Sequence, residues 1–104
     1  MNTLISSTGN KLDSRFDLRF GRAGWFCLLN EETGETRFYE NENKEASHGA
    51  GTLAVEKVIE LGAARVISGD FGPKAKELLE KFNIQMVLLS DDSKSIADII
   101  DGIK

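Results

Sequence analysis

The stretch ARVISGDFGPKAKELLEKFNIQMVLLS, residues 64–90, decides the fold of this chain. A short apolar segment at 64–68 leads through GDFGP into a region with apolar residues at helical spacing. A nearly continuous apolar run follows at 84–90. The order strand, helix, strand predicts two parallel strands joined by a right-handed crossover, and Pro73 suits the first turn of the helix. The unbroken run at 84–90 favours an interior position in the sheet.

The segments on either side extend this pattern. Toward the N-terminus, the runs at 3–8, 25–30 and 35–40 are typical of strands. The turn EETG joins the last two runs as a hairpin in which Gly34 can take a positive φ. A long loop without regular periodicity occupies 10–24, and we expect it to be mobile.

Two further helices are indicated by apolar residues at helical spacing. The first runs from Leu53 to Leu61 and ends at Gly62, which fits the left-handed position after a helix. The second follows the last strand, with Ser93 as its expected N-cap. Its apolar face comprises Ile96, Ile99, Ile100 and Ile103.

The element order β-β-β-α-β-α-β-α predicts an α/β fold. Right-handed crossovers give a five-stranded mixed sheet of order 3-2-1-4-5, with strand 2 antiparallel and three helices on its faces. A chain of 104 residues is long enough for one hydrophobic core, so we expect a single domain over residues 1–104.

The composition excludes several classes of protein. The net charge of −4 and the lack of a dense Lys/Arg run argue against nucleic-acid binding. The apolar runs are too short for a membrane span, and the N-terminus lacks the pattern of a signal peptide, so we expect a cytoplasmic protein. Cys27 is the only cysteine. It is expected in the core, and it rules out a cluster held by four thiolates of one chain.

In the predicted strand order, the connections of strands 1 and 4 leave in opposite directions. A crevice therefore opens at the carboxyl ends of these strands, where α/β proteins commonly bind ligands. Four segments should meet there: residues 6–9, the 10–24 loop with its three arginines, SHGAG at 47–51 and GDFGP at 69–73. Two of them are helix N-termini, which favour anions. The candidate site residues are Ser7, Thr8, Arg19, Arg22, His48, Gly49, Gly51, Gly69, Asp70 and Gly72.

Each candidate also has a structural interpretation. His48, the only histidine, is either a ligand or proton-transfer group at a helix N-terminus or a surface or capping residue. The glycines are either a cradle for a ligand or simple turn residues, and Arg15, Arg19 and Arg22 are either ligand contacts or solvated side chains. No nucleophile with a base other than His48 is evident, so no enzymatic activity is predicted.

Three motifs resemble one known family. The stretches DLRFGRAGWF (17–26), HGAGTLAVEKVIELGA (48–63) and VISGDFGPKAKELL (66–79) are similar to the dinitrogenase iron-molybdenum cofactor biosynthesis family, which includes NifX, NafY and the carboxyl-terminal domain of NifB. The resemblance implies a ribonuclease H-like three-layer domain. It also implies a non-catalytic carrier that transiently binds an iron-sulfur or iron-molybdenum cluster. Its implied partners are metallocofactor assembly or acceptor proteins, and we expect a monomer or weak homodimer.

One position departs from the family pattern. Many members have a histidine directly before the FG dipeptide of the first motif, where this chain has Arg19. Arginine can donate charge-assisted hydrogen bonds but is not an ordinary metal ligand. His48 is therefore the only imidazole available as a metal ligand. The alternative function is a small-anion or regulatory module that uses the same fold without a cluster.

Overall fold

Eight elements follow one another along residues 1–103, which are the residues that the computed structural model describes. Their bounds are β1 (Asn2–Ser7), β2 (Trp25–Asn30), β3 (Thr36–Glu40), α1 (Ala50–Glu60), β4 (Arg65–Ser68), α2 (Pro73–Lys81), β5 (Gln85–Leu88) and α3 (Ile96–Ile103). The predicted element order is confirmed. Helix α1 begins earlier than the apolar spacing indicated, at Ala50 instead of Leu53.

The strands form one mixed sheet of order β3-β2-β1-β4-β5. Strand β1 pairs antiparallel with β2 and parallel with β4, β2 pairs antiparallel with β3, and β4 pairs parallel with β5. The predicted order, with β2 antiparallel to β1, is confirmed. Gly34 takes a φ of 79° in the turn between β2 and β3, as expected. The ribonuclease H-like classification stays a prediction.

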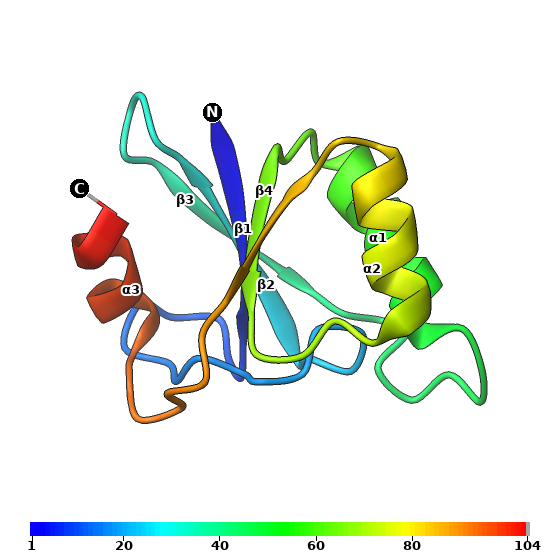
Figure 1. Cartoon of the computed structure of the whole chain (residues 1–104). Coiled ribbons are helices and arrows are strands. Elements are labelled where there is room, and N and C mark those ends of the chain that lie inside the picture. The colour runs from blue at the N-terminus through cyan, green and yellow to red at the C-terminus, as the bar shows by residue number, and fades with distance from the viewer. Residues whose placement is uncertain (104) are drawn as a thin grey trace.

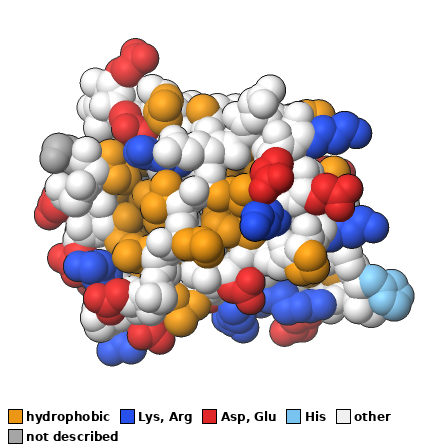
Figure 2. All heavy atoms as spheres, in the orientation of Figure 1, with side chains coloured by type: hydrophobic (Ala, Val, Ile, Leu, Met, Phe, Trp, Pro, Cys, Tyr) orange, Lys and Arg blue, Asp and Glu red, His pale blue; other side chains and the backbone are white. Residues whose placement is uncertain are grey.

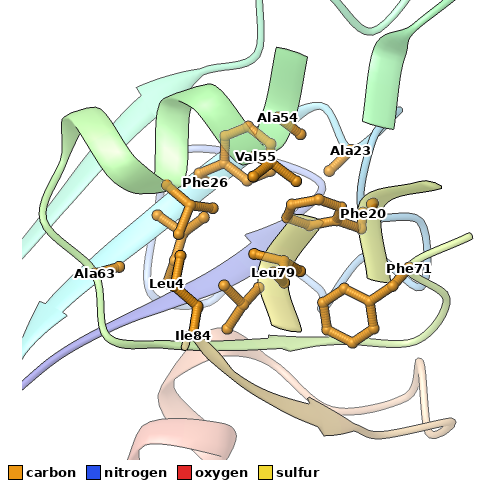
Figure 3. Close-up of a cluster of buried hydrophobic side chains, with 13 residues drawn as sticks. Leu4, Phe20, Ala23, Phe26, Ala54, Val55, Ala63, Phe71, Leu79 and Ile84 are labelled. Carbon is orange, nitrogen blue, oxygen red and sulfur yellow. The ribbon is translucent and has the colours of Figure 1, made fainter. Parts of the chain in front are cut away.

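Helices cover both faces of the sheet (Figure 1). Successive residues of β1 point to opposite faces, so Leu4 packs in the hydrophobic cluster under α1 and α2, and Ile5 in the cluster under α3. Figure 3 shows the first cluster, in which Leu79 of α2 lies among side chains from the sheet and from α1. Cys27 belongs to the second cluster and is fully buried, and this burial raises the pKa of its thiol to about 12.

The position of β5 agrees with the predicted strand order but corrects the expectation drawn from its apolar run alone. The apolar run at 84–90 predicted an interior strand, but β5 is an edge strand, and Leu88 is 70% exposed. The run is apolar because Met86 packs against the α1/α2 cluster and Val87 against the α3 cluster. Both faces of the strand are partly covered, while one of its edges stays open.

The N-cap of α3 is a second correction, since Ser95 takes the place expected for Ser93. The backbone N–H of Asp98 donates to Ser95 Oγ at 3.1 Å, and the N–H of Ser95 donates to Asp98 Oδ2 at 3.0 Å. This reciprocal pair is a capping box. Ser93 instead bonds to the carboxylate of Asp91 in the preceding turn.

The 10–24 loop is the third correction. Two of its aromatic side chains are almost fully buried, Phe16 in the α3 cluster and Phe20 in the α1/α2 cluster. The loop is therefore anchored on both faces of the sheet, in contrast to the mobile segment expected from its lack of periodicity. Within residues 1–103, no helix has the length and apolar composition needed to span a membrane.

Candidate functional site

A crevice of about 430 Å³ opens beyond the carboxyl end of β4. Its walls come from three segments, residues 19–22, 49–52 and 70–75. Figure 1 shows α1 and α2 beginning at this same end of the molecule. The crevice lies where the parallel strands β1 and β4 end, which is the place that the strand order predicted.

Both helices begin at the crevice without a side-chain cap. Their N-caps are Gly49 and Gly72, each in a conformation with positive φ (72° and 73°) that favours glycine. The first intrahelical bonds run from Leu53 N–H to the Gly49 carbonyl at 2.9 Å and from Lys76 N–H to the Gly72 carbonyl at 3.0 Å. The N–H groups before these have no carbonyl partner within their helices. They belong to residues of the crevice wall, so both positive dipole ends lie there.

Small residues allow these segments to approach one another closely. A Cβ added at Gly21 would lie 2.8 Å from the backbone nitrogen of Gly51, and one added at Gly51 would meet the Cβ of Ala75 at 3.4 Å. Beside them, the rings of Phe20 and Phe71 lie 5.3 Å apart (Figure 3). The crevice therefore has an aromatic side, and its helix N-termini are held close together.

Positive side chains outnumber negative ones along the wall, which contains Arg19, Arg22, Lys74 and Asp70. The Arg19 guanidinium donates to both carboxylate oxygens of Asp17, at 3.1 Å from Nε and 3.1 Å from Nη2. These hydrogen bonds and the charge of Asp17 raise the pKa of Arg19. Asp17 is only 4% exposed, so a buried carboxylate holds the guanidinium of Arg19 in place. The arginine side chain itself remains 66% exposed to solvent.

Arg22 lines both the crevice and a second hollow of about 290 Å³. Its Nη1 donates to the backbone carbonyl of Lys44 at 2.8 Å, which ties the loop before α1 to the 10–24 loop. The second hollow is lined by Thr8, Asp17, Arg19, Arg22, Gly24, Lys44 and Glu45. The two arginines thus face both spaces.

Most of the polar groups in this region are hydrogen-bond donors that could bind an anion. Among residues 1–103, no three His, Cys, Asp or Glu side chains are grouped so that they could hold a metal ion. What the crevice offers instead is backbone N–H groups, guanidinium groups and an ammonium group. Such groups bind negative charge by hydrogen bonding and charge attraction.

The family model described as "Dinitrogenase iron-molybdenum cofactor" matches residues 1–104. The chain belongs to the dinitrogenase iron-molybdenum cofactor family. An uncharacterized protein of Methanocaldococcus jannaschii is 27% identical over 77 residues, which cover 71% of this chain and 65% of that protein. The chain thus spans less than two thirds of the length of this curated relative.

Two solved structures of similar fold were found for this family member. The apo form of the orange protein from Desulfovibrio gigas superimposes with a TM-score of 0.91 at 26% identity, covering 98% of this chain and 85% of that one. The solution structure of a putative NifB protein from Thermotoga superimposes with a TM-score of 0.83 at 26% identity and the same coverage.

Most of the candidate residues named from the sequence of this family member do line the crevice. They are Arg19, Arg22, Gly49, Gly51, Asp70 and Gly72. Asp70 also stabilises the turn into α2, because its Oδ1 accepts from the N–H of Gly72 at 3.1 Å.

The other candidates lie elsewhere. Ser7 is buried, and its hydroxyl donates to the Gly9 carbonyl at 2.7 Å, whereas Thr8 lines the second hollow. Gly69 serves close packing, since a Cβ there would lie 2.8 Å from the Cα of Leu18. His48 is exposed directly before Gly49 and is not part of the crevice wall. In Figure 2 the histidine side chain protrudes at the rim of the molecule.

Sequence reasoning missed several residues of the wall. Lys74 follows Pro73 in the first turn of α2, and Thr52 lies in the first turn of α1. Both could have been found by counting the first turn of each helix from its glycine N-cap. Gly21 lies inside the FGRAG stretch, but no local signal indicates that it contacts Gly51, because that contact depends on the tertiary fold.

Proposed function

We propose that this chain binds an anionic metallocluster of the iron-sulfur or iron-molybdenum type and carries it during metallocofactor assembly, without catalysing a reaction. The observation that carries the proposal is the crevice itself. Two uncapped helix N-termini and three cationic side chains surround one space in a protein whose net charge is −4. Membership of the dinitrogenase iron-molybdenum cofactor family supports a metallocluster as the anion.

The similar structures support a binding role. The Desulfovibrio gigas orange protein was solved in an apo form, a description that implies a form with a bound group. The Thermotoga protein is described as a putative NifB protein. The crevice chemistry of this chain suits a cargo that arrives and leaves. We further propose a ribonuclease H-like fold, a cytoplasmic location, and transfer between metallocofactor assembly or acceptor proteins.

The donor set determines how such a cargo would be held. Cys27 is fully buried on the α3 side of the sheet, so the cluster keeps ligands that it brings with it. Hydrogen bonds from Arg19, Arg22 and the first-turn N–H groups would hold its negative surface. His48 is the proposed imidazole ligand, since it is exposed and adjoins the N-cap of α1. Hydrogen bonds and one imidazole would bind the cluster less tightly than a shell of thiolates, which would allow the carrier to release it.

The proposal is tested by anaerobic incubation of the protein with a donated iron-sulfur or iron-molybdenum cluster. Gel filtration followed by metal analysis then measures the iron that comigrates with the protein. We expect stoichiometric comigration for the unmodified chain. A protein fraction without iron would contradict the carrier function.

Matched variants locate the site. Arg22→Ala should strongly reduce comigrating iron, whereas Arg37→Ala, which removes an exposed arginine on β3 paired with Glu35, should not. His48→Ala tests the imidazole. Iron uptake that is unchanged in His48→Ala but lost in Arg22→Ala would assign binding to the cationic crevice and reject His48 as a ligand.

The alternative function is a small-anion or regulatory module. It is favoured by the same uncapped helix N-termini, which bind phosphate or sulfate as readily as a cluster. Amide chemical shifts of Gly51, Thr52, Lys74 and Ala75 would report titration with inorganic phosphate. Saturable shifts at these residues, together with no comigrating iron, would establish the alternative in place of the carrier.

A further inference from the structure

A buried carboxylate lies next to the crevice without lining it. Asp17 is almost fully buried and is absent from the crevice wall, whereas Arg19, which it contacts, is part of that wall. Burying a charged group costs free energy unless the group is paired and hydrogen-bonded. The partners of the Asp17 carboxylate therefore indicate what this residue does.

The acceptor sites of the Asp17 carboxylate are all used. Its Oδ1 accepts from the backbone N–H of Arg19 at 3.0 Å and from Nε of the same residue at 3.1 Å. Its Oδ2 accepts from Nη2 of Arg19 at 3.1 Å and from the backbone N–H of Gly24 at 3.3 Å. An ionised carboxylate has about four acceptor sites and no donor, so it matches this set of N–H groups. An asparagine amide would place its own NH2 group against some of these donors.

The backbone of Asp17 is fixed to two neighbouring strands of the sheet. Its N–H donates to the Ser6 carbonyl at 3.0 Å, and its carbonyl accepts from Ser6 Oγ at 2.6 Å. Ser6 Oγ also lies 2.7 Å from Ser68 Oγ, and both serines are fully buried. Ser6 belongs to β1 and Ser68 ends β4. These hydrogen bonds therefore hold Asp17 at the carboxyl ends of the strands where the crevice opens.

The carboxylate leaves one end of the Arg19 guanidinium for a ligand. An arginine side chain has five N–H donors, and Asp17 takes the one on Nε and one on Nη2. The donors of Nη1 and the second donor of Nη2 remain on a side chain that is largely exposed and lines the crevice. An anion that binds there meets an arginine already fixed in one conformation, so less side-chain entropy is lost on binding.

Arg22 in the same wall has a different environment. Its Nη1 donates to the backbone carbonyl of Lys44, which is a neutral partner in an exposed loop. The two arginines that line the crevice thus differ in how they are oriented: Arg19 by a buried carboxylate, Arg22 by one carbonyl group. This difference provides an internal comparison for the role of Asp17.

We infer that Asp17 is a positioning residue of the anion site, which is held on β1 by Ser6 and presents the Nη end of Arg19 to an anion in the crevice. Asp17 has this role only if the crevice binds an anion, so the inference rests on the proposed function or on its small-anion alternative. The two effects of Asp17 have opposite signs. Its negative charge alone would weaken the binding of an anion, whereas its positioning of Arg19 strengthens it.

The sign of one substitution separates these effects. The probe is inorganic phosphate, titrated while NMR follows the amide shifts of Gly51 and Thr52. Asp17→Asn should weaken phosphate binding roughly two- to tenfold, because Arg19 must then be ordered on binding. Asp92→Asn makes the same change of charge at an exposed residue that lines a hollow with Arg19, and it should not weaken binding. Equal or tighter binding by Asp17→Asn than by the unmodified chain would overturn the inference.

Double variants test whether Asp17 acts through Arg19. In an Arg19→Gln background, adding Asp17→Asn should not weaken phosphate binding further, because no guanidinium is left to orient. In an Arg22→Gln background, the same addition should still weaken binding. A purely structural effect on the 10–24 loop would reduce binding in both backgrounds. Equal losses in the two backgrounds would therefore contradict the positioning role.

The unmodified chain gives a test that needs no variant to fold. The Nε–H of Arg19 donates to a buried carboxylate, whereas the Nε–H of Arg37 donates to the exposed carboxylate of Glu35. The Arg19 Nε–H resonance should therefore exchange with water more slowly than that of Arg37, both without phosphate and at saturation. Exchange at Arg19 as fast as at Arg37 would show that Asp17 does not fix the guanidinium.

The results also distinguish this role from the proposed function. An unmodified chain that binds neither phosphate nor a donated cluster would reject the anion site itself, and the role of Asp17 with it. A chain that binds phosphate as tightly after Asp17→Asn as before would reject the role of Asp17 alone. The comigrating iron would then still decide between the carrier and the small-anion module.

Discussion

The N-termini of α1 and α2 contrast with that of α3. Helix α3 caps itself through Ser95 and Asp98, and it has an acidic residue in its first turn. Helices α1 and α2 have glycine N-caps, no side-chain cap and no acidic residue in the first turn. All three helices pack on the same sheet, so packing does not require the difference. The comparison shows that α1 and α2 lack stabilising side-chain caps at the ends where they line the crevice.

The largest expected effect comes from forcing the 10–24 loop away from the N-terminus of α1. Gly21→Ala places a Cβ 2.8 Å from the nitrogen and 2.9 Å from the Cα of Gly51, and backbone atoms cannot rotate away. We expect a loss of about 1–3 kcal/mol in the free energy of unfolding, typical of overpacking. Urea denaturation measures the loss, and iron comigration should fall as well.

Gly102→Ala is the control for this change. Gly102 lies in α3, and an added Cβ meets nothing within 4 Å. Alanine in a helix is favoured over glycine by about 1 kcal/mol, so this variant should be at least as stable as the parent. Equal stability of Gly21→Ala and Gly102→Ala would contradict the close packing at the crevice.

Removing the cap of α3 should have the next largest effect. Ser95→Ala deletes the oxygen that accepts from the Asp98 N–H, and loss of such an N-cap costs about 1 kcal/mol. Ser93→Ala is the matched variant, because it alters an exposed serine of the preceding turn and should change stability by less than about 0.5 kcal/mol. Thermal unfolding of both would decide between the two serines, and a larger loss from Ser93→Ala would show that the assigned cap is wrong.

Giving α1 the acidic first turn that α3 already has should produce a smaller effect of opposite sign. Thr52→Asp adds negative charge at the positive end of the helix and should raise the free energy of unfolding by about 0.3–1 kcal/mol. The same charge lies in the crevice wall, so comigrating iron should decrease. Thr52→Asn provides the uncharged comparison. A Thr52→Asp variant that gains stability and retains full iron uptake would separate the helix N-terminus from cargo binding.

The smallest effect concerns pH. Hydrogen bonds from the backbone and side chain of Ser95 lower the pKa of Asp98 in the folded protein. A carboxyl group whose pKa is lowered on folding contributes stability above its unfolded pKa, and loses that contribution as the pH falls through its folded pKa. The stability difference between the parent and Asp98→Asn should therefore shrink as the solution is acidified from neutral pH. A difference that is constant or grows in acid would exclude this contribution.

The order of the sheet could be predicted from the sequence because it follows from alternation and crossover handedness. The wall of the crevice was predicted in outline for the same reason. Gly49 and Gly72 precede α1 and α2, the two helices that come before and after β4 in the sequence. Ser93 was chosen as the cap of α3 on residue type alone. The cap at Ser95 depends on Asp98 three positions later, a spacing that residue type alone does not reveal.

Other features depend on contacts between segments that are distant in the sequence, so the local sequence could not predict them. The apolar run around Val87 has the same composition whether a strand is central or has two partly covered faces and an open edge. Phe16 and Phe20 lie in a stretch without periodicity, and only the completed sheet supplies the two clusters in which they are buried. His48 drew attention through its glycine neighbours, but the backbone at Gly49, not the imidazole, lines the crevice.

The central place of β1 has a consequence for the nascent chain. Strand β1 pairs on one side with β2, the next strand in the sequence, but on the other side Thr3 pairs with Arg65 of β4, which is synthesised much later. Until β4 emerges, one edge of β1 has no partner strand, and the hairpin of β2 and β3 can form before the sheet is complete. Closing a contact over so long a stretch costs chain entropy and slows folding. A circular permutant that joins the two ends and begins at the turn between β2 and β3 would bring β1 and β4 closer together in the order of synthesis.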